Sequence, residues 1–182
     1  MSNYLIPLMV VVPMLCAILV NAFAKFNKSI KVLTFVVAIC LPIIPLLSNY
    51  GLHFFGGYTP MLDNATGVIY HPAITYAFDM LQQIFIAAVG LITFLVAFIY
   101  LSKYKKASGQ YLFLLFMGTA SVTALMLTDD IFNMFVFFEI LALVQVGIVI
   151  ASPMDYSYEM ALKYMILGSI GSPIMLLGIG FL

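Results

Sequence analysis

Six stretches of mostly apolar residues, each about as long as a membrane-spanning helix, follow one another along this chain and constrain its fold. A transmembrane helix needs about 20 apolar residues, because the hydrocarbon core of a bilayer is roughly 30 Å thick. The predicted spans are residues 4–24, 32–49, 80–102, 110–128, 131–151 and 160–182. Hydrophobic residues make up 65% of the 182 positions and charged residues only 8%, which excludes a soluble domain or a nucleic-acid-binding protein. The sequence therefore predicts an all-α polytopic membrane protein with one transmembrane domain over residues 1–182.

One connection is long, whereas the others are short. Residues 50–79 contain glycines and prolines around short β-prone runs, which is typical of a β-hairpin, and we expect it to lie on the outer surface. The window 32–49 contains Pro42 and Pro45, which we expect to kink its helix.

The basic residues predict the orientation. All seven are lysines, and six lie in two loops: Lys25, Lys28, Lys31, Lys103, Lys105 and Lys106. With six spans, these loops share one side of the membrane, while the segment 50–79 and the Asp129-Asp130 turn lie on the other side and contain no Lys or Arg. By the positive-inside rule the lysine loops are cytoplasmic and both termini face outward, in what we expect to be a prokaryotic cell membrane.

Glu139 is the most informative single residue. It lies about eight residues into the fifth predicted span, within an otherwise apolar run. A carboxylate near the centre of a lone helix costs roughly 2.5–3.5 kcal/mol to insert, so it has to face other helices, meet a cation or water, or bind a proton. We interpret Glu139 as an ion-translocation residue. The alternative is a protonated side chain that only links two helices.

Lys163 is the one lysine outside the two loops. Its ammonium could reach the membrane surface, and Glu159, one helical turn earlier, is a possible ion-pair partner that supports the helix. The functional alternative is a buried lysine that loses and regains a proton. The residues alone leave these two readings equal.

Asp129 and Asp130 precede the fifth predicted span. Acidic residues there cap a helix and complement its dipole, and this reading is favoured over an outer ion mouth.

Thr119 and Thr123 form a mildly polar stripe on the fourth span that could face Glu139. The sixth span carries small residues that would let other helices approach closely. These are Gly168, Ser169, Gly171, Ser172, Gly178 and Gly180.

Motifs for nucleotide, redox-centre and metal binding are lacking in the sequence. It has no Walker loop, no dinucleotide fingerprint and no histidine pair within the spans, and Cys16 and Cys40 lie apart in apolar runs as small hydrophobes. We therefore expect no cofactor, no metal and no catalytic site in this chain.

Two blocks of sequence resemble one known family. Residues 128–140, TDDIFNMFVFFEI, are similar to the junction of the fourth and fifth helices in the antiporter-like subunits of respiratory complex I, Mrp sodium/proton antiporters and membrane-bound energy-converting hydrogenases. Residues 159–169, EMALKYMILGS, are similar to the start of the sixth helix of that family. Gly56-Gly57-Tyr58 and Asp79 resemble the family's outer hairpin and the start of its third helix. The resemblance covers essentially the whole chain.

The resemblance implies a role in carrying protons or sodium across a membrane. In this family a glutamate on the fifth helix influences lysines along a hydrated path, and Glu139 and Lys163 match that glutamate and the sixth-helix lysine. Full-length members have about fourteen helices in two inverted repeats, whereas this chain matches only the first six. We expect either a short or split subunit or part of a longer protein, with a partner chain supplying the remaining helices.

Two functional hypotheses follow. In the first, the chain is a translocation subunit of an ion-pumping complex, coupled to a redox module or to an antiporter partner. In the second, it is a non-conducting structural subunit that docks other membrane subunits through its small-residue faces. Both hypotheses require other membrane subunits and the lipid bilayer as partners.

Overall fold

The computed structural model of the chain describes residues 5–23, 27–48, 51–55, 62–63, 67–68, 74–103, 108–151 and 156–181. The fold is an all-α membrane fold of six helices with a small β-hairpin, as the sequence predicts. The helices are α1 (Leu5–Ala22), α2 (Asn27–Ile43), α3 (Met80–Lys103), α4 (Gly109–Leu127), α5 (Ile131–Ile150) and α6 (Ser157–Gly180). Helices α3 to α6 are long and apolar enough to cross a membrane, and α1 and α2 are shorter apolar helices.

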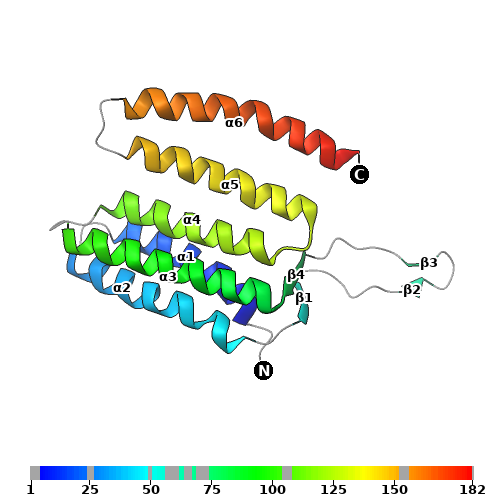
Figure 1. Cartoon of the computed structure of the whole chain (residues 1–182), viewed down its shortest axis with the longest axis horizontal. Helices are drawn as coiled ribbons and strands as arrows, with labels where there is room; N and C mark the ends of the chain where they lie inside the picture. The colour runs from blue at the N-terminus through cyan, green and yellow to red at the C-terminus, as the bar shows by residue number, and fades with distance from the viewer. Residues whose placement is uncertain are drawn as a thin grey trace.

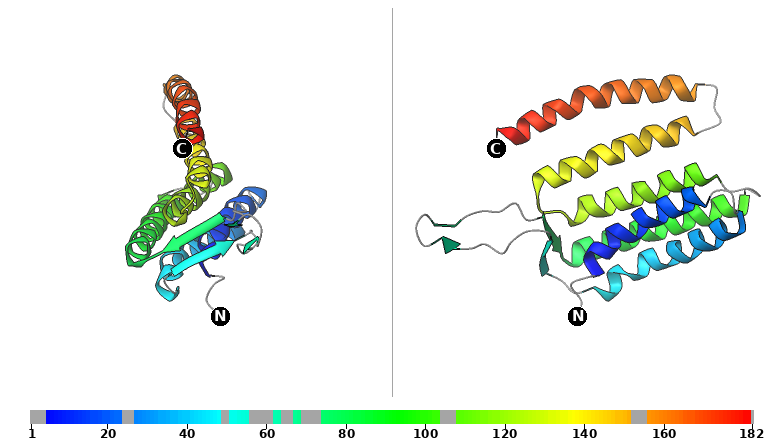
Figure 2. Two further views of the ribbon diagram at one scale, coloured as in Figure 1. Left: turned by 90° about the vertical axis from the view of Figure 1, so that its right-hand side faces the viewer. Right: turned by 180° about the vertical axis from the view of Figure 1, so that it is seen from behind.

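The six helices run up and down beside one another, but they do not form one closed bundle. Helices α1 to α4 pack together, α5 packs on α4, and α6 packs on α5 (Figure 1). An end-on view shows α5 and α6 extending away from the four-helix group as a ridge, with α6 at its edge (Figure 2). The sides of α6 that do not meet α5 are therefore exposed.

A β-hairpin connects α2 to α3. Strand β1 (Gly51–Phe55) pairs antiparallel with β4 (Ile74–Phe78), with Gly51 opposite Phe78, and the short strands β2 (Leu62–Asp63) and β3 (Gly67–Val68) pair beyond them. A bridge between Tyr76 and Thr128 joins β4 to the turn that precedes α5. The Gly56-Gly57-Tyr58 stretch lies outside the described residues.

The second helix differs from the window 32–49. Helix α2 begins at Asn27, contains Pro42 in its last turn and ends at Ile43, and a 3-10 helix, η1 (Pro45–Leu47), follows. The early start takes in lysines that a hydropathy window excludes, although long basic side chains at a helix end can reach water. The early end has a covalent cause, since Pro45 has no N–H to donate to the carbonyl of Leu41 and cannot extend an α-helix.

The described lysines share one end of the molecule, which we call the lysine end. Lys31 lies in the second turn of α2, Lys103 is the last residue of α3, and Lys163 lies in the second turn of α6. The strands β1 and β4 lie at the opposite end, which we call the hairpin end (Figure 1). Lys25, Lys105 and Lys106 lie outside the described residues.

Small residues allow close helix contacts. A Cβ atom added to Gly90 on α3 would lie 2.7 Å from the backbone nitrogen of Pro42 and 2.9 Å from the carbonyl carbon of Leu41 on α2. On α5, a Cβ on Gly147 would lie 2.7 Å from a methyl group of Leu114 on α4. Helices in lipid associate through such close packing, because the hydrocarbon tails are as apolar as the side chains they replace.

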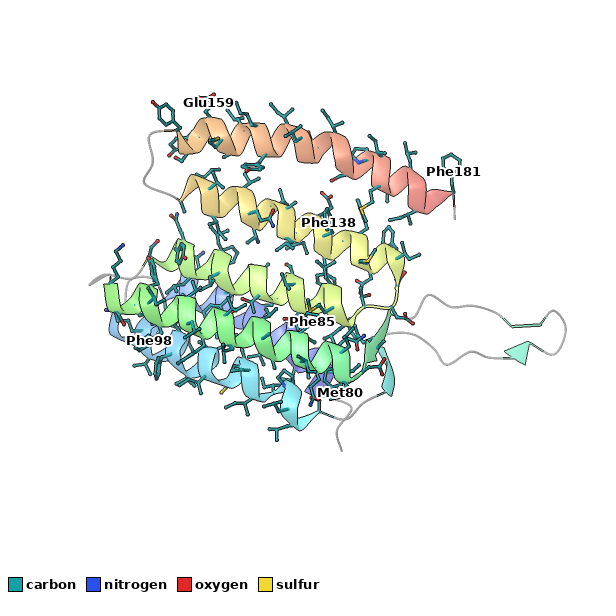
Figure 3. The ribbon with its side chains drawn as sticks, in the orientation of Figure 1. Met80, Phe85, Phe98, Phe138, Glu159 and Phe181 are labelled. Carbon is teal, nitrogen blue, oxygen red and sulfur yellow. The ribbon has the colours of Figure 1, made fainter. Side chains whose placement is uncertain are left out.

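The side chains on the outside of the helices are mostly apolar. Leu81, Ile99, Leu143, Leu167 and Ile174 are each more than half exposed. So is Met80 at the start of α3, which is labelled in Figure 3. Such a surface is what a bilayer requires of helices that face its hydrocarbon core.

The Gly90 contact generates a stability prediction. Gly90→Ala should lower the melting temperature of the purified protein, because the methyl group meets rigid backbone of α2, and overpacking of this kind costs about 1–3 kcal/mol. Gly168→Ala is the matched control, since a Cβ there meets no atom within 4 Å among the described residues and alanine favours helix. Equal melting temperatures for the two variants would show that Gly90 of α3 does not pack as closely on the backbone of α2 as the structure shows.

Candidate functional site

Glu139 is carried into the apolar part of the molecule by α5. This helix begins at Ile131, at the hairpin end, so Glu139 lies eight residues along it, or about 12 Å at 1.5 Å per residue. Its side chain is half-buried. The depth expected from the sequence is therefore also the depth in the fold.

A residue of α6 is the hydrogen-bond partner of Glu139. The hydroxyl of Ser172 donates to Glu139 Oε1 across the α5–α6 contact. The sequence identified Ser172 only as one of several small residues. Its pairing with Glu139 depends on how α6 is placed along α5, which spacing within one helix does not reveal.

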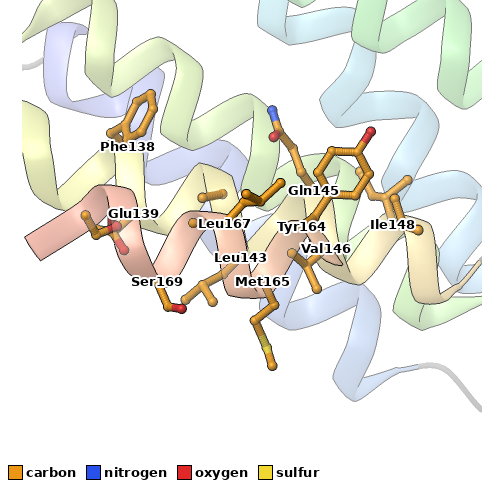
Figure 4. A pocket seen from close by; sticks show the side chains of 14 residues that line it. Phe138, Glu139, Leu143, Gln145, Val146, Ile148, Tyr164, Met165, Leu167 and Ser169 are labelled. Carbon is orange, nitrogen blue, oxygen red and sulfur yellow. Dashed lines mark hydrogen bonds between the residues drawn. The ribbon is translucent and has the colours of Figure 1, made fainter. Parts of the chain in front are cut away.

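A groove of about 650 Å³ runs along the α5–α6 contact and includes Glu139 and Ser172. Most of its lining is apolar, with Phe138, Leu143 and Leu167 among the larger side chains. Glu139 and Ser169 lie toward one end of the groove, and Gln145 and Tyr164 toward the other (Figure 4). We call this the α5–α6 groove.

Sequence reasoning missed Gln145 and Tyr164. Gln145 is exposed on the lipid-crossing part of α5, where an amide group needs hydrogen-bond partners in place of water. A signal for Gln145 was available, because it is a polar residue in an otherwise apolar run, six positions after Glu139 on the same helix.

Lys163 is held by Glu159 and does not contact Glu139. Its ammonium lies 2.6 Å from Glu159 Oε1, and both side chains are more than 60% exposed. Ser172, the partner of Glu139, lies nine positions after Lys163 on α6, which corresponds to about 14 Å along the helix axis. The structure therefore joins the predicted pair of Glu159 and Lys163, and keeps Lys163 apart from Glu139.

Asp130 caps α5. Its Oδ1 accepts a hydrogen bond of 3.1 Å from the backbone N–H of Phe132, and Asn133 Nδ2 donates to Thr128 Oγ1 at 2.9 Å. Asp129 is exposed beside it.

The same turn holds Tyr76 of the hairpin. Burial raises the pKa of the Tyr76 hydroxyl above its usual value, and a hydrogen bond with Asn133 lowers it in part. The polar groups before α5 therefore anchor the hairpin as well as the helix.

The threonine stripe does not face Glu139, and that prediction is wrong. Thr119 Oγ1 lies 3.0 Å from Thr93 Oγ1 of α3, and Thr119 and Thr123 each donate to a backbone carbonyl four residues earlier. Both line a small void beside Met9, Leu41, Ile86 and Gly90, in the four-helix group. Threonine side chains are small and can hydrogen-bond to the backbone of their own helix, so they fit the crowded interior of the four-helix group. The other side of α4 contacts α5 through Leu114 and Gly118.

The small residues of α6 meet few neighbours. A Cβ added to Gly168, Gly171, Gly178 or Gly180 would meet no atom within 4 Å among the described residues. Within the same residues, no three histidine, cysteine, aspartate or glutamate side chains come together as a metal site. The chemistry that the site offers is a carboxyl group, a hydroxyl group and an amide beside an open helix face.

Three proteins are similar to this chain in amino-acid sequence. An uncharacterised protein of Methanocaldococcus jannaschii is 38% identical over 180 residues, which is 99% of this chain and 36% of the relative. A putative antiporter subunit of Staphylococcus haemolyticus is 27% identical over all of this chain, and a subunit of a Na⁺/H⁺ antiporter of Alkalihalophilus pseudofirmus is 22% identical over 99% of it. The chain spans about a third of the length of these relatives, 36% of each. No protein-family model matches it.

Two solved structures share the fold. A chain of the Mrp complex from Dietzia sp. matches 98% of this chain with a TM-score of 0.78 and 22% identity, and the match covers 34% of that chain. A chain of a membrane-bound sulfane sulfur reductase, an archaeal respiratory membrane complex, matches 97% of this chain with a TM-score of 0.72 and 24% identity, over 36% of that chain.

Two substitutions of Asp130 distinguish a helix-capping role from a role at the outer entrance of an ion path, which we call an ion mouth. Asp130→Ala should lower the stability of the purified protein by about 0.5–2 kcal/mol, because the N–H of Phe132 loses its acceptor. Asp130→Asn should keep most of that stability, since asparagine caps about as well as aspartate while carrying no charge. A loss of ion transport in the intact complex carrying Asp130→Asn, with unchanged thermal stability, would show that the charge of Asp130 serves an ion mouth in addition to the cap.

Proposed function

We propose that this chain, which is a relative of the antiporter-like membrane subunits, acts as a membrane subunit of a multisubunit ion-translocating complex. The observation that carries the proposal is the carboxyl group of Glu139, half-buried about 12 Å along an apolar helix and bonded to Ser172 of the next helix. The transported ion is a proton or sodium, and other membrane subunits complete the path.

The position of Glu139 supports a role in translocation. A carboxyl group in hydrocarbon is costly in its charged form, so it responds strongly to any charge or water that arrives beside it. The hydroxyl of Ser172 can donate to the carboxylate and can also accept from a protonated carboxyl group. The same pair of residues can therefore hold either protonation state without moving the helices.

Lys163 is proposed to act with Glu139 through the electric field and not by contact. About 14 Å separates Ser172 from Lys163 along α6, and two unit charges at that distance interact by roughly 1 kcal/mol at an effective dielectric constant of about 20. This corresponds to about a fivefold change in an equilibrium constant. Glu159, whose Oε1 lies 2.6 Å from the ammonium of Lys163, would hold the lysine in this position.

Replacing Glu139 by glutamine tests the proposal. Glu139→Gln keeps the shape of the side chain and an oxygen that accepts from Ser172, but it cannot bind or release a proton or carry charge. We expect ion transport by the assembled complex to fall at least tenfold while subunit association is kept. Glu139→Asp, which restores a titratable group, should recover part of the transport. Full transport with glutamine would exclude a translocation role for Glu139.

Lys163 has its own test. Arginine keeps the ion pair with Glu159 but does not release its proton in proteins. If Lys163 exchanges protons, Lys163→Arg should abolish proton transport nearly as well as Lys163→Gln. If the residue only supports α6, arginine should leave transport at the level of the unchanged protein while glutamine lowers the stability slightly.

A structural subunit is the second candidate function. The observation that favours it is the open small-residue face of α6, where a Cβ added to Gly171, Gly178 or Gly180 would meet no atom within 4 Å among the described residues. In that case Glu139→Gln would be silent, while Gly171→Leu, outside the lining of the α5–α6 groove, would block the close approach of a partner helix and reduce co-purification of the other subunits. Loss of transport in Glu139→Gln with intact assembly would instead favour the translocation role.

A further inference from the structure

A second groove lies at the lysine end, between the first turns of α2 and the last turns of α3. It has a volume of about 330 Å³ and lies on the opposite edge of the molecule from α6 (Figures 1 and 3). Val32, Phe35, Val36 and Phe98 form its apolar walls, and Lys31 and Ser102 lie at its mouth. We call it the α2–α3 groove.

The walls of the α2–α3 groove are apolar and open to the surroundings. Val32 is 58% exposed, Val36 53% and Phe98 50%. The rings of Phe35 and Phe98 both pack on Phe94, with centroid distances of 6.0 and 6.2 Å, so that they form a continuous aromatic surface. On α2 the lining residues run from Lys31 to Val36, which is about 8 Å along the helix axis, so the groove leads from the lysine end toward the apolar middle of the helix.

The mouth of the groove carries positive charge. Lys31 lies in it, and Lys103 follows Ser102 at the end of α3. The sequence adds Lys25, Lys28, Lys105 and Lys106 to the same two connections, and residues 23–31 and 101–110 contain no acidic residue. Six of the seven basic residues of the chain therefore lie in these two stretches of sequence, and among the described residues Lys31 is the one that lines the groove.

We propose that the α2–α3 groove binds an anionic phospholipid from the leaflet at the lysine end. The phosphate of the lipid meets Lys31 at the mouth of the groove, and one acyl chain lies along Phe35, Val36 and Phe98. The lysines and the apolar groove have different roles. A surface rich in lysine attracts anionic lipids in general, whereas a groove beside it holds one lipid molecule in a defined place. The hydroxyl of Ser102, which donates to the carbonyl of Phe98, can still accept a hydrogen bond from a headgroup.

Lipid retention by the purified protein tests this proposal. Native mass spectrometry would compare phosphatidylglycerol with phosphatidylcholine of the same acyl chains. We expect preferential retention of phosphatidylglycerol. Lys31→Gln should lower the affinity for it about fivefold, because one lysine near an anionic membrane surface contributes about 1 kcal/mol of binding free energy. Val36→Trp should also reduce retention, because it fills the groove while leaving every charge in place.

Lys163→Gln is the matched control, since Lys163 is also at the lysine end but lies on α6, away from the groove. It should bind phosphatidylglycerol as well as the unchanged protein does. Equal retention of the two lipids, or an equal loss in Lys31→Gln and Lys163→Gln, would overturn the proposal, and so would unchanged retention in Val36→Trp.

A photoreactive amino acid at position 36, used in intact membranes, identifies the occupant directly. A lipid adduct is the expected result. An adduct with a protein chain would mean that another subunit covers this face and would also overturn the proposal.

Discussion

The bilayer interior offers no water to hydrogen-bond the backbone, and the rest of this structure depends on that constraint. Helices satisfy their own N–H and C=O groups, so the chain crosses as helices and places its irregular backbone and its β-hairpin at the ends. The same solvent explains where the charges lie. Asp130 caps a helix at the hairpin end, Lys31 and Lys103 lie at the lysine end, and Glu139 is the exception that draws attention to function.

Lipid also changes what holds the helices together. Exposed leucine and isoleucine side chains gain nothing from leaving hydrocarbon, so the contacts depend on close approach. Gly90 lets α3 touch the backbone of α2 beside Pro42, and Gly147 lets α5 receive Leu114 of α4. The glycines of α6 meet no such partner among the described residues. This contrast makes α6 the element on which both candidate functions depend, either as a wall of an ion path or as a docking helix.

The site combines what sequence could and could not predict. The depth of Glu139 followed from counting residues in an apolar run, and the pairing of Glu159 with Lys163 followed from their spacing of one helical turn. Both are local properties of one helix. The partner of Glu139, the position of Gln145 in the same groove and the turning of Thr119 toward Thr93 depend on how helices are rotated against one another. The almost uniformly apolar helices carry little information about that rotation.

Hydropathy was sufficient to predict a six-helix membrane fold, because it depends only on the transfer of side chains between water and lipid, and the glycines and prolines of residues 50–79 predicted the hairpin. The start of α2 at Asn27 and its end before Pro45 show the limit of that reasoning, since a helix can extend beyond its apolar window and a proline can end it early. Only the tertiary structure decided that α6 packs on α5 at the edge of the molecule, and that Glu139 meets Ser172, which lies about 14 Å along α6 from Lys163. The physical reason is that helix order, rotation and offset arise from the shapes of facing surfaces, which a one-dimensional pattern of apolar residues does not contain.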